Sequence, residues 1–465
     1  MERKPHCKEK EAIREILIHS SELRRWQLWI VMLRKLSFIP GKLLRYYSMN
    51  THMRTVTTGP RVVQQTYGPP DDSRTDPPDS CIDRVPRSIR AGKKEAYTPK
   101  ILSIGPLHRR GEELQDMDGR KERHEEGFFR RTERNREYFS EIINTHSNQI
   151  QNFYSGTSNL ENDEHFDMIR RDAIFILELL LRNFEGNAND RLLRIPADKL
   201  ALKLDLLLLE NQLPYFLLEE IYNSIRSSLS NLGNPSFIKI CLKFFRPLFF
   251  SSDVSDEHGF MHFTDMLRDT LVQNFRAEDR PEDYEGNDSE PLPCATKLHE
   301  SGVKFTRDQS PSLLEVKFEG SELRMPLLSV HHKTETLLRN IMALEQCKYH
   351  SRTIVCDYVI LLDDLIEDER DTQLLVDAGI ISNSIGDCKA LANLFNKLSV
   401  EICSSGYHYN YIYQGLKGHY NSKYNRDMAK LKSVYFGDIW KGTATIGASV
   451  LLILTFLQTI NSFKR

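Results

Sequence analysis

The segment LLLLENQLPYFLLEEIY (206–222) constrains the fold most, because its apolar residues are typical of buried helix and Pro214 interrupts them. Proline lacks an amide hydrogen, and its ring clashes with the carbonyl four residues earlier, which here belongs to Glu210. A helix must therefore bend or end here, and backbone groups lose their partners. Glu210, Asn211 and Gln212 stand at the break and can replace those partners, while Pro214 suits the first turn of the next helix. The segment predicts a fixed corner in an apolar core.

A catalytic interpretation of the same region rests on its carboxylates. Asp205 and Glu210 lie about 140° apart on an ideal helix, so they share a cavity only if the helix breaks. Asp172, in the apolar segment RRDAIFILEL, could approach them in space. Such a cluster can serve as acid and base. Structural networks also bury carboxylates, and a polar cluster that locks helices together is the favoured interpretation.

Apolar residues recur at three- and four-residue spacings through most of the chain, which predicts a mainly α fold with a multi-helix globular body. The segments RRDAIFILELLLRNF, TETLLRNIMALEQC, TQLLVDAGII and DCKALANLFNKL all show this spacing. Gly379 is expected to end the third of these helices. The segment 313–328 instead alternates apolar and polar residues around Glu319 and Gly320, which predicts a small β-hairpin.

Composition divides the chain into six parts. Residues 1–61 carry thirteen Lys and Arg against five Glu, which predicts a basic leader that is poorly ordered or forms an amphipathic surface helix. Segments rich in Gly, Pro, Asp and Ser (62–80) and in acidic residues (277–293) are expected to be linkers. The expected modules are a helical first module (81–276) and a helical second module (294–441) that contains the hairpin.

The last part, Gly442 to Ile460, is nineteen residues long and carries no charge. As a helix it spans about 29 Å, close to the thickness of a bilayer hydrocarbon core. Lys441 precedes it and Lys464 and Arg465 follow it, which favours a transmembrane segment over a buried helix. We expect a single-pass protein anchored at its C-terminus, with the bulk of the chain in the cytosol, at the plasma membrane or an endomembrane.

Motifs for catalysis, cofactors or metals are absent from the sequence. It contains no GxGxxG, GxxxxGK[ST], HExxH or GxSxG segment, so no cofactor is predicted. His258 and His262 have the spacing of metal ligands but lack a fixed third ligand, so a solvated surface pair is expected. The eight cysteines are scattered, which favours buried free thiols. A net charge of −2 offers no field that would attract nucleic acid.

Seven blocks of sequence, in order, resemble the plant family called domain of unknown function 247. LLLENQLPYFLLEEIY matches its signature, and IDRVPRSIR…AYTPKILSIGPLH (82–108) matches its opening motif. Shorter blocks follow at MDGRKER, ATKLHESGVKF, LLRNIMALEQC, Gly379 to Ile381, and LLILTFLQT. The motif residues taken as structural or family positions are Val85, Pro86, Tyr97, Pro99, Gly105, Pro106, His108, Asp172, Asp205, Glu210, Asn211, Gln212, Pro214 and Glu345.

The resemblance implies a helical body, a C-terminal membrane segment and no established catalytic activity. Relatives in grasses are associated with self-incompatibility, which implies a recognition or interaction module. The favoured hypothesis is a membrane-anchored protein that contacts a protein partner through a variable surface at residues 226–293. The alternative is a hydrolase-like enzyme that uses His108 with the buried carboxylates. A third hypothesis is a scaffold held on lipid by both its leader and its anchor.

Overall fold

The computed structural model describes residues 82–108, 117–154, 163–186, 190–250, 259–273, 275, 291–403, 408–436 and 439–463. The chain separates into two units, Met1–Gly68 and Pro69–Arg465, and all described residues belong to the second unit. The predicted basic leader, the linker at 62–80 and nearly all of the acidic linker lie outside the described residues. The division of the remainder into two modules stays a prediction.

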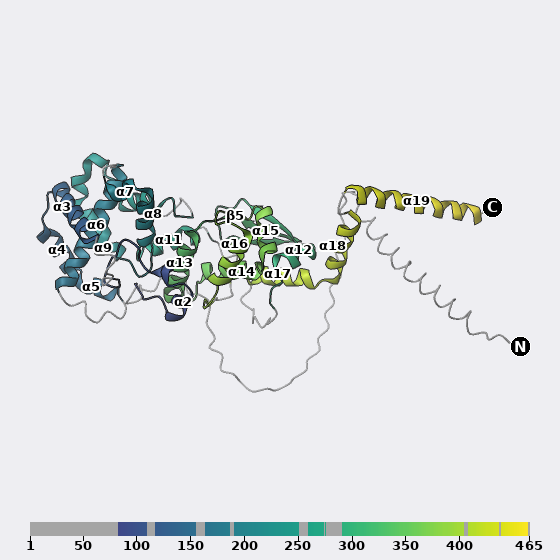
Figure 1. Ribbon diagram of the computed structural model, residues 1–465, viewed down its shortest axis with the longest axis horizontal. Helices are drawn as coiled ribbons and strands as arrows, with labels where there is room; N and C mark the ends of the chain where they lie inside the picture. The colour runs from purple at the N-terminus through teal and green to yellow at the C-terminus, as the bar shows by residue number, and fades with distance from the viewer. Residues whose placement is uncertain are drawn as a thin grey trace, which may run out of the picture. The chain divides into compact units, whose positions relative to one another are not determined.

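The N-terminal half of the described chain is helical. Its elements are α2 (Arg87–Gly92), η1 (Lys94–Tyr97), α3 (Asp118–Thr132), α4 (Arg136–Thr145), α5 (Ser147–Asn152), α6 (Asp163–Glu185), α7 (Arg191–Arg194), α8 (Pro196–Asp205), α9 (Tyr215–Ile225), η3 (Arg226–Leu232), α10 (Phe237–Phe245) and α11 (Phe263–Val272). The long helix α6 packs against α3, α4, α9 and α10 (Figure 1). Its side chains from Asp172 to Leu181 are all buried, as expected for a core helix whose sides are covered by other helices.

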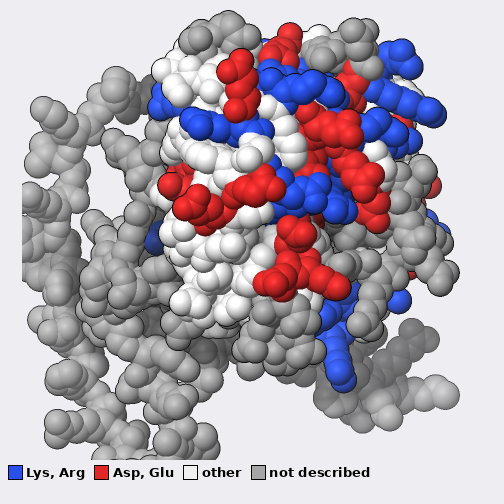
Figure 2. Space-filling view, turned by 90° about the vertical axis from the view of Figure 1, so that its left-hand side faces the viewer, with Lys and Arg blue, Asp and Glu red and all other residues white. Residues whose placement is uncertain are grey.

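Ion pairs connect α3 and α6 at the edge of this core. Arg131 of α3 pairs with Glu178 of α6 at 2.8 Å. Arg182 of α6 contacts Glu178 at 2.7 Å and Asp190 at 2.9 Å. The face nearest α3 and α4 carries interleaved acidic and basic side chains (Figure 2). The charges on this face therefore balance locally instead of forming a surface of one sign.

The C-terminal half combines helices with short strands. Its helices are α12 (Ala295–Glu300), α13 (Thr334–Lys348), α14 (Ile354–Leu365), α15 (Glu369–Asp377), α16 (Cys388–Leu398), α17 (Asn410–Asn421), α18 (Lys423–Phe436) and α19 (Ile439–Phe463). The strands are β1 (Lys304–Asp308), β2 (Lys317–Glu319), β3 (Glu322–Pro326), β4 (Leu328–Val330) and β5 (Ile381–Asn383). This mainly helical architecture with small sheets confirms the predicted fold class.

The hairpin forms, but it is shorter than the predicted range and belongs to a larger sheet. Antiparallel β2 and β3 turn at Gly320, whose φ is 64°, and β1 adds to β3 in parallel. Residues 313–316 are not strand, and two of their carbonyl oxygens accept hydrogen bonds from tyrosine hydroxyl groups. Tyr409 donates to Leu314 O at 2.6 Å, and Tyr411 donates to Val316 O. A second sheet pairs β4 with β5 in parallel, and the sequence pattern did not predict it.

Gly379 ends α15, in agreement with the predicted stop. Its φ is 71°, and the amide of Ile380 returns to the carbonyl of Leu375 at 3.0 Å. Glycine adopts this left-handed conformation without the steric cost of a Cβ atom. The turn directs the chain from α15 straight into β5.

Helix α19 contains the predicted membrane segment. Its window Thr445–Ser462 is long and apolar enough to span a membrane, and none of it is buried against the protein. Exposed side chains include Leu451 at 65 % and Phe456 at 61 %. By its length, composition and exposure, α19 is a candidate for a membrane span.

Candidate functional site

The corner at Pro214 forms, but α8 ends at Asp205, earlier than a break at Pro214 alone would require. Asn211 Nδ2 donates to the carbonyl of Asp205 at 2.8 Å. Gln212 Nε2 donates to the carbonyls of Leu206 and Leu208 at 2.8 and 2.7 Å. Side-chain amides thus replace the backbone donors that a continuing helix would supply. Pro214 occupies the position immediately before α9, not its first turn.

The opening motif of the family lies against this corner. The Asp205 carboxylate accepts hydrogen bonds from the amides of Lys100, Ile101 and Leu102 at 2.8 to 3.1 Å. Asn211 Oδ1 accepts from the amide of Ile104 at 2.6 Å, and its Nδ2 donates to Leu102 O at 2.9 Å. A segment about a hundred residues earlier in the chain is thereby held in a fixed extended path.

Gly105 is required where this path turns. Its φ is 67°, and a Cβ at this position would lie 2.9 Å from the carbonyl oxygen of Gln212. Its amide donates to Asp172 Oδ2 at 2.9 Å. Asp172 also pairs with Lys121 Nζ at 2.6 Å, and the same ammonium group donates to Ser103 O. Burial raises the pKa of Asp172, while Lys121 and the Gly105 amide oppose that shift.

Glu210 connects the corner to the first described residues. It accepts a hydrogen bond from the amide of Val85 at 2.7 Å, lies 2.9 Å from His108 Nε2, and pairs with Arg90. Burial acts to raise its pKa, but the contacts with His108 and Arg90 outweigh burial and hold the pKa below its usual value. Glu210 is therefore an ionised carboxylate that lies between the Arg90 guanidinium group and the His108 ring.

Glu345 of α13 is, like Glu210, a buried carboxylate that binds backbone amides and an arginine. It pairs with Arg268 Nε at 2.9 Å and accepts from the amides of Val355 and Cys356, each at 3.0 Å, at the start of α14. These amides have no partner within their own helix, so the carboxylate caps α14.

Asn340, also on α13, was missed by the sequence analysis. It accepts from Leu209 N and donates to Ala96 O, at 2.9 and 2.8 Å. It is the neighbour of Ile341 in the otherwise apolar segment NIMAL, and a lone amide in such a run is the signal that points to it.

The other motif positions belong to the same framework. Val85, Tyr97, Pro99 and Gly105 are buried, and Pro86 and Pro106 are partly buried. Asp172, Asp205 and Glu210 thus lie around one corner, where backbone amides and cationic side chains occupy their oxygens. The enzyme alternative requires a cavity between these groups, and the pocket described below is lined by none of them.

The expectation for His262 is wrong, whereas the expectation of buried free thiols is confirmed for three of the described cysteines. His262 is fully buried, not solvated, because its ring accepts a hydrogen bond from Asp265 N at 3.3 Å and caps α11. Its expected companion His258 lies outside the described residues. Among the described free cysteines, Cys241, Cys294 and Cys356 are buried, but Cys403 is exposed. No group of three His, Cys, Asp or Glu side chains within the described ranges is placed to hold a metal ion.

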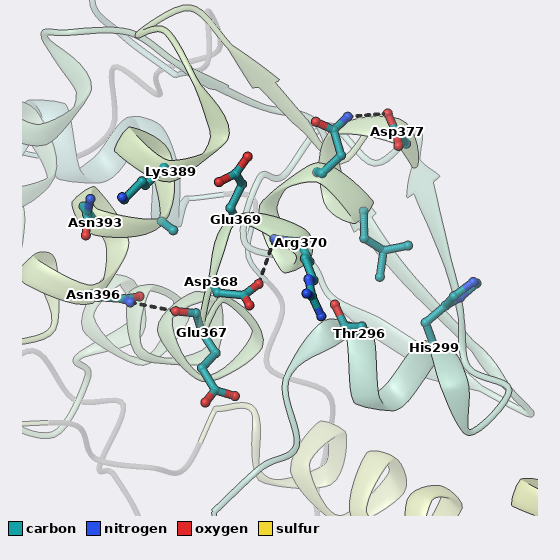
Figure 3. A pocket seen from close by; sticks show the side chains of 13 residues that line it. Thr296, His299, Glu367, Asp368, Glu369, Arg370, Asp377, Lys389, Asn393 and Asn396 are labelled. Carbon is teal, nitrogen blue, oxygen red and sulfur yellow. Dashed lines mark hydrogen bonds between the residues drawn. The ribbon is translucent and has the colours of Figure 1, made fainter.

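A pocket of about 840 Å³ lies between α12, α15 and α16 (Figure 3). Its lining residues are polar or charged, with two apolar exceptions: Thr296, His299, Glu367, Asp368, Glu369, Arg370, Gln373, Leu374, Asp377, Lys389, Ala392, Asn393 and Asn396. Figure 3 shows the Arg370 side chain directed toward Thr296, and Lys389 beside Asn393.

Asp371 beneath the pocket holds its walls together. This buried carboxylate accepts from Thr296 N at 2.7 Å, Glu367 N at 3.0 Å and Asp368 N at 3.1 Å. Burial would raise its pKa, but these donors and their neighbours hold it below the usual value. The start of α12 and the start of α15 are therefore fixed relative to each other. Asn396 Nδ2 adds α16 by donating to Glu367 O at 3.2 Å.

Several polar side chains of this pocket have no hydrogen-bonding or ion-pair partner among the described residues. Arg370, Lys389, Glu369 and Asn393 make no side-chain hydrogen bond or ion pair with any residue that the structure describes. Sequence reasoning missed them, because nothing in the sequence distinguishes them from ordinary solvated residues, and the pocket exists only where α12 and α16 both pack against α15. The lining offers both signs of charge and carboxamides from the α15 region and α16, and Thr296 and His299 from α12.

Comparisons with known proteins agree with the motif blocks. The family model described as plant protein of unknown function, DUF247, matches residues 82–454. The UPF0481 protein At3g47200 of Arabidopsis thaliana is 27 % identical over 412 residues, which cover 82 % of this chain and 85 % of the relative. The putative UPF0481 protein At3g02645 of the same plant is 25 % identical over 171 residues, 36 % of this chain and 32 % of the relative. No solved structure matches. Because the family match spans most of the chain, the protein belongs to the plant domain of unknown function 247 family.

Proposed function

We propose that this protein is a membrane-anchored recognition module that binds a polar peptide segment of a protein partner in the pocket between α12, α15 and α16. The observation that carries the proposal is the set of unused polar side chains there: Arg370, Lys389, Glu369 and Asn393. Exposed charges presented by rigid helices at a hollow provide directional contacts before a partner arrives, which limits the entropy lost on binding.

A peptide fits this lining better than a small apolar ligand does. The residues that line small-molecule sites are mostly apolar, whereas all but Leu374 and Ala392 of the residues that line this pocket are polar or charged. Carboxamides such as Asn393 can pair with both donors and acceptors of a peptide backbone. Arg370 and Glu369 would bind side chains of opposite sign on the partner, and such complementarity supplies specificity.

Helix α19 supports the membrane part of the proposal. We place the bulk of the chain in the cytosol, at the plasma membrane or an endomembrane, with α19 as the single anchor. Carbonate extraction of the full chain, beside a chain that ends at Gly442, tests the anchor. Protease protection in sealed vesicles tests the orientation. Release of both chains by carbonate, or protection of the large domain, would contradict this placement.

Photo-cross-linking in plant membranes tests the pocket directly. A photoreactive residue in place of Asn393 should cross-link to one defined protein, and Arg370→Glu or Lys389→Glu should reduce that product at least about tenfold. Lys397→Glu is the matched control, because Lys397 is an exposed lysine of the same helix α16 that does not line the pocket. Equal loss with Lys397→Glu, or unchanged cross-linking in both pocket variants, would reject the proposal.

The resemblance to relatives associated with self-incompatibility in grasses supports recognition of a protein partner over turnover of a substrate in this proposal. The partner surface predicted at 226–293 stays a separate prediction, since residues 251–258 and 276–290 lie outside the described chain. Replacing that segment should leave cross-linking at Asn393 intact if the pocket is the binding site.

A further inference from the structure

Lys203 of α8 is a largely buried lysine that has no counterion among the described residues. Its relative exposure is 6 %, and its ammonium group lies 5.0 Å from the ring centroid of Phe244. Within the described ranges it makes no hydrogen bond to an oxygen atom and no ion pair with a carboxylate. The apolar stem of Lys203 is therefore covered by the protein, while its ammonium group, which has no anionic partner among the described residues, can still reach a ligand from solvent.

Two further lysines approach the same place. Lys199 lies one helical turn before Lys203 on α8, so the two side chains share a face of the helix. Lys333, just before α13, donates from Nζ to the carbonyl of Pro247 at 2.8 Å, three residues beyond Phe244. Lys203 and Lys333 therefore each place an ammonium group against a residue near the end of α10, and Lys199 lies on the same face of α8 as Lys203.

The electrostatics of Lys203 agree with this geometry. Burial lowers its pKa to about 8, and repulsion from Lys199 and Lys333 acts in the same direction. No carboxylate of the described chain forms an ion pair with any of these three lysines. The Pro247 carbonyl satisfies one donor of Lys333 and leaves the other N–H donors of the three ammonium groups available.

We propose that Lys199, Lys203 and Lys333 form a binding site for a phosphate dianion, carried either by a lipid headgroup or by a soluble phosphorylated molecule. A dianion with several acceptor oxygens can accept from all three ammonium groups at once, whereas a single carboxylate carries half that charge. Lysine acts at phosphate sites as a point charge, without the planar geometry that arginine requires. The aromatic ring of Phe244 would hold the Lys203 stem and orient its ammonium group.

The full chain in phosphatidylcholine nanodiscs provides the test. Inorganic phosphate is titrated by calorimetry and thermal unfolding, against sodium acetate at equal ionic strength. In parallel, the neutral lipid is replaced by lipid containing phosphatidylinositol 4-phosphate. If the ligand is a soluble phosphorylated molecule, phosphate should raise the Tm in the neutral nanodiscs. If the ligand is a lipid headgroup, the nanodiscs that contain the phosphoinositide should raise the Tm. Either result supports the site if it depends on the three lysines.

Lys199→Gln, Lys203→Met and Lys333→Gln should each weaken binding about tenfold, as expected for the loss of one charged hydrogen bond. Lys199 and Lys333 are only partly buried, so their variants remove a charge from the site without changing the core around Phe244. Lys239→Gln, at an exposed lysine of α10, is the matched control and should bind like the unaltered chain. The proposal is overturned if neither ligand raises the Tm, or if Lys239→Gln reduces binding as much as the other variants do.

Discussion

Asn211→Asp tests the hydrogen bonds that the Asn211 side chain donates, without changing the size of that side chain. The substitution keeps the volume of the side chain and leaves Oδ1 able to accept from the amide of Ile104. The donating nitrogen becomes an oxygen, which then faces the carbonyls of Leu102 and Asp205 at the positions of bonds that measure 2.9 and 2.8 Å. The variant therefore loses two hydrogen bonds and brings an acceptor against two other acceptors.

The expected loss of stability follows from these contacts. Each buried carbonyl left without a donor costs about 1–3 kcal/mol. Asn211 is 1 % exposed, so water cannot replace the lost donor. We expect the free energy of unfolding to fall by about 3–5 kcal/mol, and the urea midpoint to fall by about 1 M. Far-ultraviolet circular dichroism measures this midpoint, because the chain is mainly helical.

Asn393→Asp is the matched control for this experiment. Asn393 is exposed and makes no side-chain hydrogen bond within the described chain, so its conversion should change stability by less than about 0.5 kcal/mol. A loss below about 1 kcal/mol for Asn211→Asp, or equal losses for both variants, would refute the assignment of Asn211 as the group that holds the broken backbone.

Three further predictions concern the same half of the chain. Gly105→Ala should reduce the free energy of unfolding by about 2–4 kcal/mol, because φ is 67° and the new methyl group meets the Gln212 carbonyl at 2.9 Å; a thermal melt unchanged within error would contradict this. The pKa of Glu210 is lowered on folding, so its stabilisation is present above the unfolded pKa and is lost as pH falls through the folded one. In urea unfolding at several acidic pH values, the free energy of unfolding should therefore change less with pH in Glu210→Gln than in the unaltered chain. An identical dependence on pH in both chains would contradict this role of Glu210. Lys203 has its pKa lowered to about 8, so the unfolded chain binds more protons between that value and its ordinary pKa, and stability should rise with pH across this window. Lys203→Met should abolish that rise and stabilise the chain by about 1–2 kcal/mol at neutral pH after allowance for solvent screening, and retention of the rise would assign it to other groups.

The helices were the most predictable part of the fold. Apolar spacing located α6, α9, α13, α15 and α16, because a helix that packs against a core needs a continuous apolar face. Gly379 located the end of α15 for an equally local reason, since only glycine adopts positive φ without strain. The strands were less predictable. β5 pairs with β4 across about fifty residues, and a strand of three residues is too short to show a recognisable alternation of apolar and polar residues.

The candidate sites divide in the same way. The polar residues beside Pro214 were predictable as a group, because a broken helix needs local partners. Their actual partners in the 99–105 segment were not, since hydrogen bonds across about a hundred residues depend on how the chain returns. The pocket and the lysine cluster were not predictable either, because Arg370, Lys389 and Lys203 resemble solvated side chains in the sequence.

The sequence by itself determined the helical character of the body, the break at Pro214, the turn at Gly379 and the charge-free length of α19. Each of these depends on residues within one or two turns of one another, where backbone sterics and apolar periodicity decide the outcome. Tertiary structure alone decided which amides the Asp205 and Asn211 side chains bind, which helices enclose the pocket, and that Lys203 is buried beside two other cations. These outcomes depend on long-range packing, because the distance between two groups in the folded chain cannot be deduced from their separation in the sequence.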